Sequence, residues 1–145
     1  MPAEPDRAAI YTLLDHTADL GIVVYGKDIP TLFTHAAWAL FDVISDATTI
    51  RPRCSLPITL DAIDREDLLV QWLGELLYLY DTQRFLCCNV TFTVLEPTRL
   101  EATIYGETLD ESRHPIDTEI KAVTYHQIVV EQVGTHWQAQ VIFDV

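Results

Sequence analysis

The sequence predicts an α+β fold: a single-domain, two-layer sandwich in which a mixed or mostly antiparallel sheet packs two main helices on one face. Two segments, 27–46 and 64–83, repeat apolar residues at helical spacing. The C-terminal half instead alternates apolar and polar residues on both sides of turn sequences, which indicates consecutive β-hairpins. A length of 145 residues suits one domain. We expect a flexible tail over residues 1–10 and a single domain over 11–145.

The first element is a pair of strands within residues 10–26, "IYTLLDHTADLGIVVYG". The run from Ile22 to Tyr25 is rich in residues that favour strands, and Gly26 closes it. Between the two strands lies a polar interruption, "DHTAD", from Asp15 to Asp19. This interruption is unusual between apolar neighbours and needs an explanation as a turn, a metal site, a catalytic cluster or a docking surface.

A helix is predicted over residues 27–46. Asp28 is a suitable N-cap, and Pro30 falls in the first turn, where a missing N–H costs little. His35 is expected at the boundary of the core rather than as a ligand. The residues expected to face the core are Leu32, Phe33, Ala36, Ala37, Leu40, Phe41 and Ile44.

An irregular or edge strand follows within residues 49–64, because its two prolines interrupt a strand pattern. The second helix is predicted over 64–83, with Asp64 as N-cap and Asp67 three residues later. Trp72 falls on its apolar stripe and is expected in the core.

The hairpins complete the chain. The first spans residues 87–110 and turns at "EPTR", with Val90, Phe92 and Val94 on one face. A polar loop is expected over 111–120. The second hairpin spans 121–145 and turns near Gly134.

The composition of the chain disfavours some classes of binding partner. Nine Lys and Arg residues stand against 22 Asp and Glu residues, for a formal net charge of −13. Such a surface disfavours direct binding to nucleic acid or to anionic membranes, and suits a basic protein partner or a cation. Cys54, Cys87 and Cys88 form no disulfide framework and are interpreted as reduced thiols. With no signal-peptide or membrane-span pattern in the sequence, we expect a cytoplasmic protein.

Four polar groups stand outside the predicted core. They are Asp15–Asp19, Arg113–His114, Lys121 with Thr124–Tyr125–His126, and the terminal pair Asp144–Val145. Turn and cap roles explain carboxylates such as Asp15 and Asp19 in many proteins. Alternatively, Asp19, Asp144 and a terminal oxygen could form an all-oxygen site for a hard cation such as Ca²⁺ or Mg²⁺.

Other chemistries have weaker support in the sequence. His16, His114 and His126 could hold zinc or manganese, but they lie on separate elements without a metal-binding spacing. There is no GxSxG nucleophile motif and no glycine-rich phosphate loop.

Five segments, in this order, resemble the archease family. They are "DHTADLGI" at 15–22, "ALFDVISD" at 39–46, "DLLVQWLGELLYLYD" at 67–81, "YGETLDESRHPIDTEIKAVTYH" at 105–126 and the terminal "VIFDV". The resemblance covers nearly the whole chain after residue 10, and it implies an archease-like fold.

The resemblance also implies a function. Archeases assist a GTP-dependent RNA ligase of the tRNA-splicing type, which joins 3'-phosphate or 2',3'-cyclic phosphate ends to 5'-hydroxyl ends. They promote guanylylation of the active-site histidine of the ligase, sustain multiple turnover and can broaden the nucleotide that the ligase accepts. The protein itself is expected to be a non-catalytic partner of that ligase.

Family members bind a divalent cation near the two chain ends. Carried over by position, the ligands would be Asp19, Asp144 and the backbone or terminal oxygens of Val145, with Ca²⁺ favoured and Mg²⁺ or Mn²⁺ as alternatives. As a metal ligand, Asp15 is less favoured than Asp19. Supporting or docking roles are expected for Asp15, His16, His114, Lys121 and His126.

Two rival functions remain at this point. One is a metal-dependent phosphate-ester hydrolase using Asp19, His16 and His126. The other is a chaperone-like binding module in which the metal has no role.

Overall fold

The computed structural model describes residues 6–14 and 19–145. Within them, two antiparallel sheets enclose two long helices. The elements in chain order are α1 (Arg7–Ile10), β1 (Tyr11–Leu14), β2 (Leu20–Gly26), α2 (Ile29–Ile44), the 3₁₀ turn η1 (Ala47–Thr49), β3 (Cys54–Asp61), α3 (Arg65–Gln83), β4 (Phe85–Glu96), β5 (Arg99–Thr108), β6 (Ala122–Val123), β7 (Val129–Val133) and β8 (His136–Asp144).

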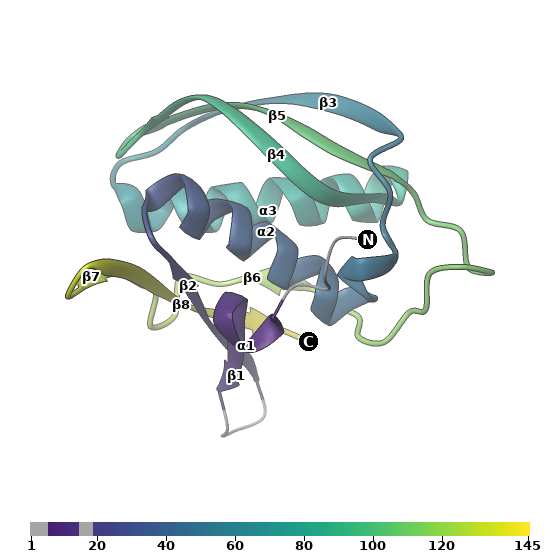
Figure 1. The fold of residues 1–145 in the computed structure, drawn as a ribbon, viewed down its shortest axis with the longest axis horizontal. Helices are drawn as coiled ribbons and strands as arrows, with labels where there is room; N and C mark the ends of the chain where they lie inside the picture. Colours follow the sequence, from purple (N-terminus) through teal and green to yellow (C-terminus); the bar gives the residue numbers. More distant parts are fainter. Residues whose placement is uncertain (1–5, 15–18) are drawn as a thin grey trace.

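Helices α2 and α3 lie between the two sheets (Figure 1). The larger sheet has the order β1-β2-β8-β6, with β7 also paired to β8. The smaller sheet has the order β3-β5-β4. The predicted α+β class and the antiparallel pairing are therefore confirmed.

The layering corrects one detail of the prediction, which placed both helices on one face of a single sheet. Helix α2 buries nine of its 16 residues, so it needs apolar partners on more than one side. The two sheets provide them. Alternation along a strand shows that one face is buried, but it does not show which strands share a sheet.

The starts of both helices follow the prediction. Asp28 Oδ1 accepts a hydrogen bond from the Thr31 amide at 2.8 Å, and Asp64 Oδ1 accepts one from the Asp67 amide at 2.8 Å. Each cap satisfies a backbone N–H that the helix itself leaves free. Helix α3 ends where Arg84 adopts a left-handed conformation, with φ of 56°.

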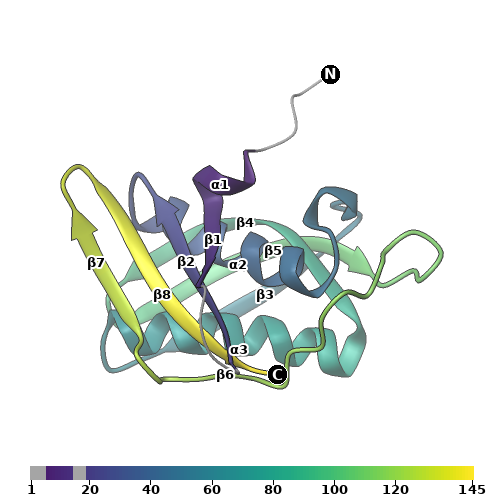
Figure 2. The same ribbon diagram turned by 90° about the horizontal axis from the view of Figure 1, so that it is seen from below.

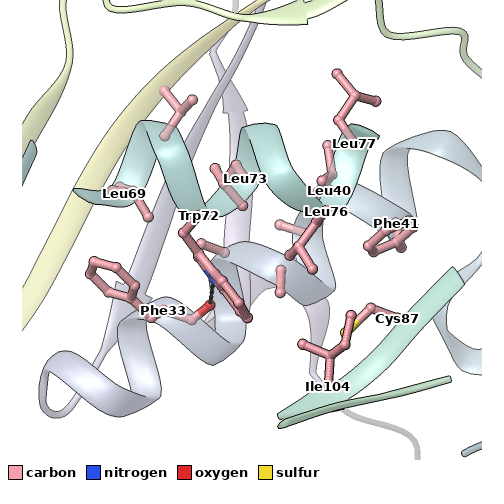
Figure 3. Packing of buried hydrophobic residues seen from close by; sticks show 14 of the residues in the cluster. Phe33, Leu40, Phe41, Leu69, Trp72, Leu73, Leu76, Leu77, Cys87 and Ile104 are labelled. Carbon is pink, nitrogen blue, oxygen red and sulfur yellow. Dashed lines mark hydrogen bonds between the residues drawn. The ribbon is translucent and has the colours of Figure 1, made fainter. Parts of the chain in front are cut away.

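The core lies on both sides of the helices. One part faces the β3-β5-β4 sheet (Figure 3), and another faces Ile22 of β2 and Val141 of β8 in the larger sheet. Trp72 is fully buried, as predicted, and its Nε1 donates a hydrogen bond to the Phe33 carbonyl at 3.0 Å. This bond ties α3 to α2 and leaves no polar atom of the indole unsatisfied.

The first hairpin is confirmed as β4 and β5, with Val90 opposite Ile104. The second differs from its prediction. Its first arm is divided into the short strand β6 and the strand β7, because Gln127 has a positive φ of 53° and interrupts the extended backbone. Both parts still pair with β8, which is therefore the central strand of the larger sheet.

Helix α1 forms part of the segment predicted as a tail (Figure 2). Arg7 joins it to α2 through an ion pair with Asp42 at 3.0 Å and to the start of η1 through one with Asp46 at 2.9 Å. In the part of the chain that the structure describes, no helix is both long and apolar enough to cross a membrane.

Candidate functional site

Asp19 and Asp144 lie at the same end of the β2–β8 strand pair in the larger sheet. The last registered pair between β2 and β8 is Leu20 with Phe143. Asp19 directly precedes Leu20, and Asp144 directly follows Phe143. The two aspartates therefore adjoin the last registered pair from neighbouring antiparallel strands, and both are exposed.

Lys121 lies on the other side of Asp144. Its amide donates a hydrogen bond to the Asp144 carbonyl at 2.8 Å, and the next residue, Ala122, pairs with Asp144 in the sheet. Segments far apart in sequence thus converge beside the C-terminal residue, Val145 (Figure 2). We call Asp19, Lys121, Asp144 and Val145 the sheet tip.

The loop that leads to Lys121 is held to the body of the protein although it is irregular. The Asp117 amide donates a hydrogen bond to the Ile44 carbonyl at the end of α2, at 2.9 Å. Ile120, next to Lys121, is buried in the core. These two anchors fix the approach of the chain to the tip.

The donor chemistry of the sheet tip suits a hard cation, because Asp19, Asp144 and the main chain of Val145 offer only oxygen atoms. Asp15 and His16, the other predicted residues of this region, lie outside the described residues. Among residues 6–14 and 19–145, no group of three or more His, Cys, Asp or Glu side chains is arranged to hold a metal ion. Among the described residues of the sheet tip, the acidic side chains are therefore those of Asp19 and Asp144.

His114 has a structural role rather than a place at the tip. It is buried, and its Nδ1 accepts a hydrogen bond from the Asp110 amide at 2.9 Å. Nε2 must then carry the proton, and it donates a hydrogen bond to Glu107 at 3.1 Å. Both ring nitrogens are engaged, so His114 is not free to complete a zinc or manganese site. His126 lies exposed in the turn after β6.

Glu107 is the buried acid that sequence reasoning missed. Its carboxylate accepts hydrogen bonds from the Arg113 guanidinium, from the Arg51 amide at 2.7 Å and from His114. Burial opposes ionisation, but these donors outweigh it and lower the pKa of Glu107 to about 2. Arg113 also donates to the Thr49 carbonyl at 2.9 Å. The cluster joins the end of β5 to the loops on both sides.

A signal for Glu107 did exist in the sequence. Leu100, Ala102 and Ile104 predict that even-numbered positions of β5 face inward, and Gly106 continues this pattern. Glu107 is also buried and so breaks the alternation. An acid at the end of a strand, six residues before Arg113, was a candidate for a buried ion pair.

The comparisons with known proteins agree with one another. The model of the Archease protein family matches residues 11–145. "Protein archease" of Methanosarcina acetivorans is 34% identical over 145 residues, covering 97% of this chain and 99% of the relative. "Protein archease" of Sulfurisphaera tokodaii is 32% identical over 136 residues, covering 93% of this chain and 98% of the relative.

Two solved structures share the fold. The solution structure of protein 1598 of Methanobacterium thermoautotrophicum has a TM-score of 0.76 and 31% identity, covering 93% of this chain and 98% of that one. A crystal structure from Thermotoga maritima, described as "an archease, possible chaperone", has a TM-score of 0.62 and 20% identity, covering 91% of this chain and 94% of that one.

Proposed function

The chain belongs to the archease family, and on that premise we propose that it is a non-catalytic accessory protein that activates a GTP-dependent RNA ligase of the tRNA-splicing type. It promotes guanylylation of the active-site histidine of the ligase and sustains multiple turnover. It can also broaden the nucleotide that the ligase accepts. Its place is in tRNA splicing and RNA repair in the cytoplasm.

The observation that supports this proposal most is the position of Asp19 and Asp144 at the same end of the β2–β8 strand pair. Two exposed carboxylates at neighbouring positions repel each other, and a cation bound between them would offset this repulsion. We propose that Asp19, Asp144 and the main-chain oxygen of Val145 hold a divalent cation, with Ca²⁺ favoured and Mg²⁺ or Mn²⁺ accepted. When bound, this cation would offset negative charge on phosphate oxygens.

The other residues of the tip position this pair. The backbone bond from Lys121 holds Asp144 at the end of β8. The Lys121 ammonium group carries the basic charge of the tip and suits contact with a phosphate or an acidic group of the ligase complex. His114 acts at a distance, by holding the loop before Lys121 through Glu107. His126, exposed in the turn after β6, is available for docking.

The charge of the whole chain favours a basic enzyme as partner. A formal net charge of −13 repels RNA and attracts a protein surface built to bind RNA. Such attraction increases the association rate and weakens as salt screens it. The accessory protein would therefore contact the ligase rather than the RNA.

Ligation turnover by the cognate ligase tests this proposal. With RNA substrate in excess, ligase alone should stop after few turnovers, and ligase with this protein should continue. Asp81→Asn, which changes an exposed carboxylate of α3, serves as the control variant and should sustain turnover like the wild-type protein. Equal product with and without the wild-type protein would refute the proposed function.

A further inference from the structure

Two residues with exposed side chains are hydrogen-bonded to one carboxylate near the start of α3, Tyr125 through its hydroxyl and Ile63 through its backbone amide. Asp67 Oδ1 accepts a hydrogen bond from the Tyr125 hydroxyl at 2.6 Å, and Asp67 Oδ2 accepts one from the Ile63 amide at 3.0 Å. Gln71 Nε2 also donates to this carboxylate at 3.0 Å. We call Ile63 and Tyr125 the Ile63–Tyr125 patch.

Both side chains of the patch are exposed although they are large and apolar. Ile63 is 85% exposed and Tyr125 is 57% exposed. Single exposed apolar residues are common. Here, however, the Asp67 carboxylate holds the Tyr125 side chain by its hydroxyl and the Ile63 backbone by its amide. The Tyr125 ring would therefore lose little conformational freedom when a partner covers it.

The patch continues into the sheet tip. Tyr125 follows β6, whose Ala122 pairs with Asp144. Between them, Thr124 is held to the Ile142 carbonyl by its amide at 3.1 Å and its hydroxyl at 2.8 Å. The segment from Lys121 to Tyr125 thus joins the tip to the patch. A partner that receives the tip would also meet Tyr125.

Three acidic residues lie at the start of α3, beside the patch. Asp64, Glu66 and Asp67 lie in the first turn of α3 or cap it. Within the described ranges, none of the three forms an ion pair with a basic side chain. The nearby Arg65 guanidinium instead stacks on the Trp137 ring, 5.3 Å from its centroid. The rim of the patch therefore remains negative.

We propose that the Ile63–Tyr125 patch is the docking surface for the protein partner, which covers it with an apolar recess bordered by Lys or Arg side chains. This inference rests on the proposed function, because the partner is the ligase that the sheet tip serves. Tyr is enriched among the residues that dominate binding energy, and protein interfaces combine an apolar centre with a polar rim. The tip would then activate the ligase, and the patch would hold it.

Matched variants test the separate roles of patch and tip. Ile63→Ser is compared with Ile116→Ser, which changes an isoleucine that is 50% exposed in the 109–121 loop. Tyr125→Ala is compared with Tyr78→Ala, since Tyr78 is 59% exposed on α3. Tyr125→Phe keeps the ring and removes only the hydroxyl. Thermal unfolding verifies that every variant folds.

The measurements are the dissociation constant for the ligase and the stimulation of ligase guanylylation as the accessory protein is titrated. Ile63→Ser and Tyr125→Ala should raise the dissociation constant and the half-saturating concentration by about tenfold or more. The plateau of stimulation should stay near the wild-type value. Tyr125→Phe should raise the dissociation constant far less, and both control variants should bind like wild type. Asp19→Asn should instead lower the plateau.

Equal binding by Ile63→Ser, Tyr125→Ala and the two controls would overturn the docking inference and leave the proposed function intact, provided that wild type stimulates. A lower plateau for the patch variants with unchanged half-saturation would also overturn it, since that is the behaviour of an activating group. If wild type neither binds nor stimulates the ligase, the proposed function fails, and the docking inference fails with it.

Discussion

His114 donates a hydrogen bond to Glu107 at 3.1 Å inside the protein, where the His114 side chain has no exposed surface and that of Glu107 is 5% exposed. Arg113 neutralises this buried acid, and the Arg51 amide completes its hydrogen bonds. The cluster lies at the start of the loop that ends at Lys121. The Glu107 cluster therefore holds the start of this loop, and the Asp117 amide and buried Ile120 hold its end beside the sheet tip.

Glu107→Gln should destabilise the fold. It removes the charge that balances the Arg113 guanidinium and replaces an acceptor oxygen by a donor. Breaking a buried ion pair in this way should lower the free energy of unfolding by about 3 kcal/mol. Urea unfolding measures the change. Glu96→Gln, at an exposed position of β4, should change the free energy of unfolding by less than about 0.5 kcal/mol.

Acid should unfold the protein partly through Glu107. Its pKa is about 2 in the folded protein, against an ordinary value of 4.5. A carboxyl group whose pKa is lower in the folded state stabilises the fold above the ordinary value, and this contribution is lost as pH falls from about 4.5 toward 2. The free energy of unfolding should decline across that window. Glu107→Gln should show a shallower decline, and an equal slope would contradict this assignment.

Much of the local structure could be predicted from the sequence, because its signals lie within a few residues. Asp28 and Asp64 cap the helices that they precede, and the alternation at Val90 and Phe92 identified a strand. The division into two sheets could not be predicted in this way. It depends on β2 pairing with β8, which is a contact between the two ends of the chain.

The candidate site shows the same limit. Composition and spacing left "DHTAD" as either a turn or a cation site, and only the family resemblance connected Asp19 with Asp144. The register of β2 and β8 places these two residues at the same end of the strand pair, and the cation site stays a prediction. The contact between Tyr125 and Asp67 left no pattern in the sequence, because a hydrogen bond between distant segments has no fixed spacing.

Calcium should stabilise the wild-type protein if the tip binds it. A ligand that binds only the folded state at 100 times its dissociation constant adds about 2.7 kcal/mol to the free energy of unfolding. Thermal unfolding with CaCl₂ and with EDTA measures this difference. Asp19→Asn and Asp144→Asn should remove the effect of calcium, and Asp81→Asn should keep it. Equal stabilisation of all four proteins would place calcium elsewhere.

Association with the ligase should depend strongly on salt. Attraction between an acidic accessory protein and a basic enzyme is screened over about 10 Å at 0.1 M ionic strength. The association rate should therefore fall severalfold when salt rises from 50 to about 300 mM, with a smaller change in the dissociation rate. Surface-based kinetic binding measures both rates. An association rate that does not change with salt would argue against charge as the attractive force.

The central claim is that Asp19 and Asp144 form the group that activates the ligase. Covalent transfer of labelled GMP onto the ligase tests it most directly, measured after one round of ligation has removed the first GMP. Renewed labelling is expected with the wild-type protein and with Asp81→Asn. Little labelling is expected with Asp19→Asn or Asp144→Asn, even at concentrations that saturate binding. Full labelling with both tip variants would contradict the central claim.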